Sequence, residues 1–447
     1  MKHTKRAVCL CLAALLFIAC SFAGCGAGGW NAAMPPAGPQ EPGGEDFYWL
    51  DDGEDPYWPD DGESPDWPDA FAPDGQEPLP TEAPATQDLA QLDPSAYSGA
   101  FGSRTTLTDP TTGVPVMDAV LPQGWTAQVQ TNWSFVSTVN PCVAVVQFTS
   151  PDGRAAVVIQ TAQDFLESYD TSGLFPHQDY IDQQTYIVHL AYKNAGEMLD
   201  MYFNGVLGTG GTVVSETPVP AEAQQLVDQV AQNYLTTLVN GVNEITSGYG
   251  SPVQAGGSEG TISLRRYRFT AADGQSYLAD AMALTVAAQY THSSTGTSFV
   301  NIHWVVPGIV ICIAQDEATL EEYSTQFEMI TENAVIRNEF NYIKSLYGND
   351  IRNKIMQQQA SSIAAMTEAQ AQTYLNSYDS SNSSGYTSDD WANDWSDFIY
   401  DRNEYTTADG SNIKVGTDVD AVYQNGDDFY FGSQGSAPFG WEQLTPN

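Results

Sequence analysis

The side chains that could catalyse a reaction are few in this sequence. Of its five histidines, the one best placed for chemistry is His177, in the predicted loop FPHQD, two residues before Asp179. A histidine beside a carboxylate can act as a general base, but a catalytic triad also needs a nucleophile. We predict structural roles for His177, His189, His292 and His303. His177 with Asp179 is kept as the one catalytic or metal-binding candidate pair.

Four aspartates form a second group of candidates, on one side of a predicted helix over residues 390–400: Asp389, Asp390, Asp394 and Asp397. Glycoside hydrolysis requires two carboxylates that face each other across a sugar, whereas these four lie on one short segment. Aspartates at a helix N-terminus are also favoured by the helix dipole. We therefore interpret the group as a solvated face, with a cation or substrate site as the alternative.

A cysteine near the N-terminus carries the clearest chemical signal. Basic residues (MKHTKR) precede an apolar run over 7–19 that is short for a bilayer-spanning helix, and Cys25 then follows Ala-Gly. This order resembles the lipobox of bacterial lipoproteins. The resemblance implies cleavage of a signal peptide over 1–24, thioether lipidation of Cys25, and a mature protein at the extracytoplasmic face of the cell membrane. Cys20 is a rival site, and an ordinary signal peptide is the other alternative.

The segment that follows has its own composition. Residues 26–95 contain 13 of the 25 prolines and 17 acidic residues, without Lys or Arg. Such a segment cannot bury enough apolar surface to offset its ordering entropy, so we predict a disordered acidic tether over 25–95, which would reach on the order of 200 Å when extended. A degenerate nine-residue repeat carries Trp49, Trp58 and Trp67. These belong either to a plain spacer or to a docking site for a basic partner; loose Ca²⁺ binding by the repeat's aspartates is a third alternative.

The charge of the chain limits its partners. The formal net charge is −41, and residues 96–447 alone hold 39 acidic against 12 basic residues. Such a chain repels nucleic acid and anionic lipid headgroups, so we expect no nucleic-acid partner. The one basic cluster, Arg265-Arg266-Tyr267-Arg268, lies in a predicted strand. We interpret it as an exposed strand face with local salt bridges, with a small-anion site as the alternative.

The remaining motifs argue against enzymatic chemistry. The sequence has no HExxH motif, no GxxxxGK phosphate loop and no Cys-x-x-Cys pair. We therefore predict no catalytic residue, no metal site and no cofactor. The folded part holds Cys142 and Cys312, each in an apolar strand-like run. A disulfide between them and two buried free thiols are equally compatible with an extracytoplasmic location.

The folded part is predicted to divide into four segments: an α+β domain over 104–347, a helical segment over 350–378, a polar linker over 379–388, and a C-terminal helix with a β-meander over 389–447. Three aromatic residues are each followed by a turn that ends in Asp-Gly, at Gly153, Gly274 and Gly410. This turn chemistry predicts antiparallel hairpins. Apolar spacing predicts helices over 195–205, 221–242, 317–347 and 350–377, with Gly348 ending the third.

Two stretches carry a family resemblance. The turn 121–125 (LPQGW) with the hairpin at 150–153 (SPDG) resembles the opening of PsbP-like α/β/α domains. Residues 398–444, with DGSNIKVGTDVDAVYQNGDDFYFGS and GWEQL, are similar to the tail of uncharacterised bacterial lipoproteins that carry such a domain. The resemblance implies an α+β fold in which an antiparallel sheet is flanked by helices. It implies no catalytic residue, because this fold mostly serves as an assembly or binding module.

Together these features favour a non-enzymatic lipoprotein that binds or scaffolds another component of the cell envelope, either a protein or cell-wall material. A hydrolase acting on peptide or glycan through His177 and Asp179 is the first alternative. A solute-binding lipoprotein is the second.

Overall fold

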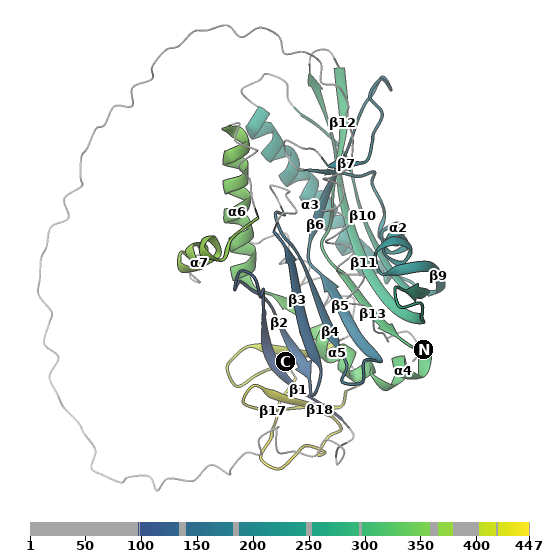
Figure 1. The fold of residues 1–447 in the computed structure, drawn as a ribbon, viewed down its shortest axis with the longest axis vertical. Helices are drawn as coiled ribbons and strands as arrows, with labels where there is room; N and C mark the ends of the chain where they lie inside the picture. The colour runs from purple at the N-terminus through teal and green to yellow at the C-terminus, as the bar shows by residue number, and fades with distance from the viewer. Residues whose placement is uncertain are drawn as a thin grey trace, which may run out of the picture. The chain divides into compact units, whose positions relative to one another are not determined.

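The computed structural model describes nine stretches of the chain: 97, 99–133, 140–181, 187–246, 253–294, 297–357, 365–378, 402–416 and 419–446. These stretches form a mixed α/β fold with more strand than helix (Figure 1). The predicted signal peptide, tether, linker and 390–400 helix lie outside them. So do Cys20, Cys25, the three tether tryptophans and the four aspartates between 389 and 397, and the predictions for these residues stay predictions.

The larger of the two main sheets has eleven strands. Their bounds are β3 (Thr126–Asn132), β4 (Val143–Thr149), β5 (Ala155–Gln160), β6 (Gln163–Asp170), β7 (Tyr180–Ile181), β8 (Val188–His189), β9 (Gly208–Glu216), β10 (Gln254–Ala271), β11 (Ser276–Ser294), β12 (Thr297–Val306) and β13 (Ile309–Ala314). The strand pairs are antiparallel, except that β6 and β8 pair in parallel at Leu166 and His189. The antiparallel organisation predicted from the turns is therefore confirmed in this sheet.

The predicted hairpin turns are present. Gly153 lies between β4 and β5, and Gly274 between β10 and β11. Gly410 joins β15 (Arg402–Thr406) to β16 (Asn412–Gly416). All three glycines have a φ between 70° and 82°, a region that residues with a Cβ rarely adopt. The Asp-Gly pairs therefore set the register of these strands locally.

The large sheet divides into two branches. One edge of β11 pairs with β10. The other edge pairs with β13 along residues 278–283 and with β12 along residues 286–294. Pro307 and Gly308 separate β12 from β13. Proline has no N–H for a strand ladder, so pairing is interrupted there. The next strands, β6 and β5, are separated in turn by Thr161 and Ala162. Beyond this break, β4 and β3 continue from β5, whereas β8 and β7 continue from β6.

Helices cover both faces of the sheet (Figure 1). Helix α2 (Ala195–Met201) begins with a capping box between Asn194 and Glu197 and continues as the π-helical segment η3 (Tyr202–Val206). Helix α2 packs against β11, whose Ala279, Ala281, Ala283 and Ala287 lie in the same hydrophobic cluster as the buried residues of α2. Helix α3 (Ala221–Thr246) packs instead against Leu284 and Val286 of the same strand. Because side chains alternate along a strand, α2 and α3 lie on opposite faces.

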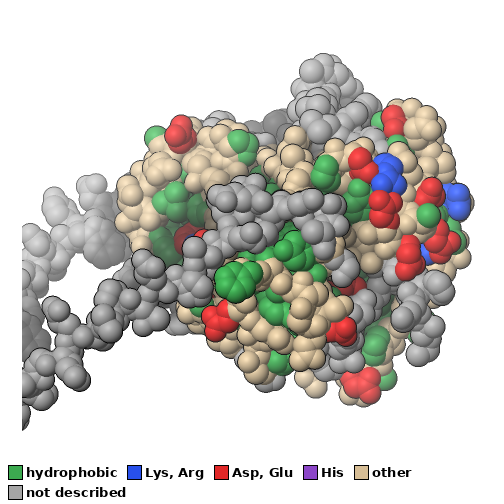
Figure 2. Space-filling model, turned by 90° about the horizontal axis from the view of Figure 1, so that it is seen from below, with side chains coloured by type: hydrophobic (Ala, Val, Ile, Leu, Met, Phe, Trp, Pro, Cys, Tyr) green, Lys and Arg blue, Asp and Glu red, His purple; other side chains and the backbone are tan. Residues whose placement is uncertain are grey.

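A second sheet joins the two ends of the described chain. Its order is β14 (Val335–Ile336), β2 (Pro115–Pro122), β1 (Ala100–Thr108), β18 (Asp428–Gly432), β17 (Ala421–Asn425) and β19 (Glu442–Gln443). The predicted C-terminal meander is present, but β18 pairs directly with β1, so these strands share a sheet with the start of the fold. Figure 2 shows the side of the molecule where Figure 1 places β17 and β18: hydrophobic side chains gather near its centre, and Asp and Glu side chains are spread over it.

The predicted helices over 317–347 and 350–377 are wrong in their bounds. The structure has α4 (Glu317–Glu322), α5 (Ser324–Asn333), α6 (Asn338–Met356) and α7 (Glu368–Asn376). Val335 and Ile336 leave the helical path because they pair with β2, and Arg337 N–H donates to the Val116 carbonyl oxygen at 2.9 Å. Gly348 lies inside α6 and ends no helix. The apolar residues whose helical spacing underlies the first of these predictions are nevertheless all buried: Leu320, Phe327, Ile330, Phe340 and Ile343.

A buried carboxylate near the start of the fold should make the stability pH-dependent. Asp109 accepts hydrogen bonds from Thr111 N–H at 3.0 Å, from the Thr112 hydroxyl and from Trp133 Nε1–H at 2.9 Å. Burial raises the pKa of Asp109, but these hydrogen bonds outweigh it, so the pKa is lowered. A lowered pKa adds stability above the unfolded-state value of about 3.9, and this is lost as the pH falls through the folded-state value.

Asp109→Asn should therefore lower the free energy of unfolding by about 1–3 kcal/mol at neutral pH. Urea unfolding should show this deficit shrinking as the pH falls below about 4, because Asp109 of the wild type is then protonated and its carboxylate no longer stabilises the fold. A deficit that stays constant with pH would contradict the assignment.

Candidate functional site

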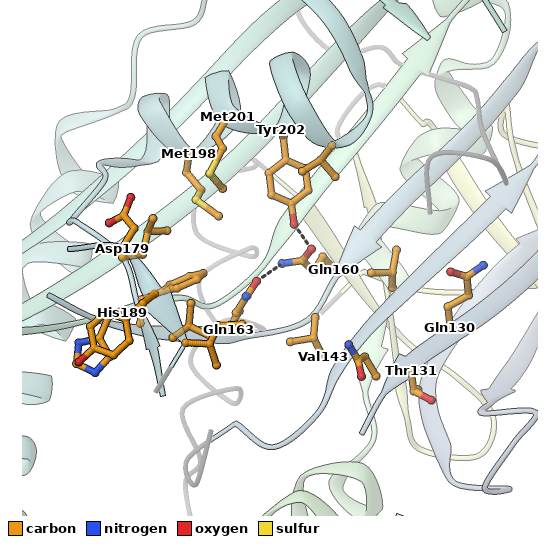
Figure 3. Close-up of a pocket in the computed structure, with 18 residues that line it drawn as sticks. Gln130, Thr131, Val143, Gln160, Gln163, Asp179, His189, Met198, Met201 and Tyr202 are labelled. Atoms are coloured by element: carbon orange, nitrogen blue, oxygen red, sulfur yellow. Dashed lines mark hydrogen bonds between the residues drawn. The ribbon is translucent and has the colours of Figure 1, made fainter. Parts of the chain in front are cut away.

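A pocket of about 380 Å³ lies where the large sheet divides. Strands β3 and β4 form one of its sides, β6, β7 and β8 form the other, and α2 with η3 covers it. Figure 3 shows this arrangement: Met198, Met201 and Tyr202 approach from the helix, Asp179 and His189 from one branch, and Gln130, Thr131 and Val143 from the other. The volume falls within the range of small-molecule sites.

The pocket is mainly apolar. Half of its 18 lining residues are Val, Ile, Leu, Met or Phe. Phe165 of β6 stacks on Trp304 of β12, with ring centroids 4.3 Å apart, and Trp304 Nε1–H donates to the Leu190 carbonyl oxygen at 3.0 Å. This fully buried tryptophan therefore fixes both a wall residue and the chain that leaves β8. Met198 and Met201 add flexible thioether side chains that adapt to differently shaped ligands.

A short chain of hydrogen bonds crosses this apolar wall. The Tyr202 hydroxyl donates to Gln160 Oε1, and Gln160 Nε2 donates to Gln163 Oε1 at 3.4 Å (Figure 3). Burial raises the pKa of Tyr202, so the hydroxyl keeps its proton at physiological pH. Gln160 is buried, and its side chain is oriented by Tyr202. The site therefore offers fixed, uncharged hydrogen-bonding groups.

The branch formed by β7 and β8 supplies an aromatic end wall. The ring of Tyr180 stacks on His189, with centroids 4.2 Å apart and planes 8° apart. Tyr180 is half exposed, whereas His189 is buried. His189, predicted to be structural, thus lies in the pocket wall under an aromatic ring.

The predicted pair His177 and Asp179 is brought together at the edge of this site. His177 Nε2 lies 2.9 Å from Asp179 Oδ1, and the same oxygen accepts Ala191 N–H at 3.0 Å. Desolvation raises the pKa of Asp179, but these hydrogen bonds and the charge of Lys193 outweigh it, so the pKa is lowered. Asp179 is thus a carboxylate at neutral pH.

The geometry of His177 does not suit general-base catalysis. Its Nδ1 accepts the backbone N–H of Ser168 at 3.3 Å, so Nε2 carries the proton and donates it to Asp179. Both ring nitrogens are engaged, whereas a triad histidine needs one nitrogen free for the nucleophile. His177 instead connects the loop after β6 to β6 itself, through its hydrogen bond with Ser168 N–H.

We expect His177→Ala to act on stability. Loss of two hydrogen bonds should lower the free energy of unfolding by about 1–2 kcal/mol, as measured by urea denaturation. His177→Gln, which keeps a donor and an acceptor, should restore part of this loss. A peptide- or glycan-hydrolysing activity that disappears in His177→Ala, with stability unchanged, would contradict the structural role.

The other histidines and cysteines lie apart from the pocket. His292 Nδ1 is 2.8 Å from Asn301 Nδ2, and His303 lies between the Tyr234 hydroxyl and the buried Asp164. Cys142 and Cys312 are both free thiols, so the disulfide alternative is not present in the structure. Burial raises the pKa of each thiol well above its usual value, so both remain protonated at neutral pH.

The basic cluster does not form an open anion site. Arg265 pairs with Asp200 at 3.4 Å and with Glu216 at 3.2 Å. Arg266 is buried and donates to both carboxylate oxygens of Asp280 and to Glu317. The salt-bridged interpretation is supported for both arginines, but Arg266 is not on an exposed face.

Searches with the whole sequence add no further assignment. No protein-family model matches the chain, and no curated protein matches it. Among the described residues, no three His, Cys, Asp or Glu side chains are grouped as metal ligands would be. No helix in the same stretches is long and apolar enough to cross a membrane.

Proposed function

We propose that this chain is a lipid-anchored binding protein of the extracytoplasmic membrane surface, and that its folded part captures a small apolar ligand in the pocket at the sheet division. The pocket is the observation that carries the proposal. It has the volume, apolar lining and few fixed polar groups typical of ligand sites. This favours the solute-binding alternative over a scaffold for a macromolecule. A small ligand derived from the cell envelope would fit both the solute-binding alternative and the predicted binding of an envelope component.

The PsbP-like resemblance stays part of this proposal. An antiparallel sheet with α2 on one face and α3 on the other is compatible with a layered domain of that kind. A binding role would fit the usual use of the fold. The His177 hydrolase is disfavoured, because both ring nitrogens of His177 are already hydrogen-bonded.

Titration calorimetry of the mature chain with decanol tests the binding function. We expect saturable binding of one decanol per chain with a negative heat-capacity change, which is the general mark of apolar burial. Absence of saturable binding for decanol and for other neutral alkyl probes would overturn the proposal.

Anchoring by Cys25 predicts a separate, all-or-none result. Cys25→Ser should leave the chain unacylated, so that it no longer sediments with membranes after a salt wash. The acyl chains contribute about 0.8 kcal/mol per buried methylene, and the acidic chain has no electrostatic attraction to replace them. Cys20→Ser is the matched control and should stay membrane-bound. If instead the Cys20→Ser variant is released from the membranes and the Cys25→Ser variant stays bound, the lipid is attached to Cys20.

A further inference from the structure

The charges around the pocket restrict which ligands it can hold. None of the 18 described residues that line it is Lys or Arg, and its one carboxylate is Asp179. Lys193 acts on Asp179 through its charge but does not line the pocket. An anionic group that entered the apolar interior would lose its hydration without gaining a counter-charge, which is costly.

The polar groups of Gln160, Gln163 and Tyr202 in the pocket wall are uncharged. Gln160 uses one amide N–H to reach Gln163 Oε1, and within the described residues the Gln163 NH₂ group has no acceptor. The Tyr202 hydroxyl holds Gln160 Oε1, which fixes the direction in which the Gln160 amide points. A ligand oxygen that accepts from these amides would satisfy donors that are already oriented.

The aromatic end wall and the methionines supply the complementary surface for an apolar body. The Tyr180 ring stacked on His189, the Phe165 ring stacked on Trp304 and the Met198 side chain leave apolar surface facing the pocket. The polar strip of Gln160, Gln163 and Tyr202 occupies only part of the wall (Figure 3). The site thus matches one small polar group joined to a larger apolar body.

We infer that the pocket selects an uncharged amphiphile, with an apolar body and a hydroxyl or carbonyl oxygen that accepts from Gln160 and Gln163, and that it rejects the corresponding carboxylate. This inference rests on the proposed binding function and adds the chemical class of the ligand. The preference for a neutral ligand is set by the residues that line the site, because they include no Lys or Arg to pair with an acid.

Calorimetric titration of the mature chain with decanol and decanoate near neutral pH tests the inference. The two probes share a chain length and differ in the charge of the end group. We expect decanoate to bind at least about tenfold more weakly than decanol. Gln163→Lys places a cation at the polar strip and should raise the decanoate affinity at least about tenfold above wild type. Gln163→Met, of similar size and uncharged, should not raise it.

The outcomes separate the two proposals. If decanoate binds wild type as tightly as decanol, the inference of charge selection is overturned while the binding function stands. If decanol and decanoate both fail to bind, the binding function fails and the inference fails with it. Should Gln163→Lys be unstable, the comparison of the two probes on wild type is sufficient to decide.

Discussion

Val143→Trp should strongly weaken the binding of decanol. Val143 lies at the start of β4, is only partly buried and lines the pocket beside Gln130 and Thr131 (Figure 3). An indole at this position would occupy space that the alkyl chain needs. Excluding about four methylenes removes ~3 kcal/mol of burial, or about a hundredfold in affinity, which titration calorimetry resolves.

A matched substitution shows whether the loss is local. Val213→Trp introduces the same change at an exposed valine of β9, a strand of the same sheet that does not line the pocket. It should leave decanol affinity within about twofold of wild type. Equal loss in both variants would mean that bulk on the sheet perturbs binding generally, and the placement of the ligand at the sheet division would be wrong.

Arg266→Met should give the largest loss of stability. The Arg266 guanidinium contacts Asp280, its cross-strand neighbour, at 2.7 and 2.8 Å, and Glu317 at the start of α4 at 2.9 Å. Removing it leaves the Asp280 carboxylate, whose side chain is 19% exposed, without its strongest counter-charge. Breaking such a buried pair typically costs about 3–5 kcal/mol, measured here by urea unfolding.

The neighbouring arginine is the control for this effect. Arg265→Met removes pairs with Asp200 and Glu216, which are about half exposed, so the expected cost is at most about 1 kcal/mol. The double variant Arg266→Met/Asp280→Leu should regain much of the stability, because both charges are then removed. Similar losses for Arg265→Met and Arg266→Met would refute the distinction between the exposed and the buried pair.

Local chemistry explains which parts of this fold could be predicted. The Asp-Gly turns at Gly153, Gly274 and Gly410 need a positive φ, so the hairpins follow from a few residues. The helical core side at Leu320 and Phe327 follows in the same way from periodicity. Strand β6 has no such signal, because Gln163, Asp164, Glu167 and Ser168 interrupt its apolar residues.

The candidate site depends on long-range strand pairings, which no local sequence pattern predicts. Gln160 and Gln163 flank the break between β5 and β6, but the division of the sheet there is set by β12 and β13, more than 130 residues later. A usable signal did exist in Met198 and Met201, which lie three residues apart on a short amphipathic helix. The pair His177 and Asp179 was found from sequence, but the Ser168 N–H that engages its second nitrogen comes from another element.

Methyl NMR of methionine-labelled chain tests the central claim, that ligand enters the pocket at the sheet division, most directly. Met198 and Met201 line this pocket, whereas Met117 and Met329 are buried elsewhere and serve as internal references. During titration with decanol we predict saturating shifts of the Met198 and Met201 methyl signals, with the two reference signals unmoved. Saturable decanol binding that leaves Met198 and Met201 unshifted would contradict the account.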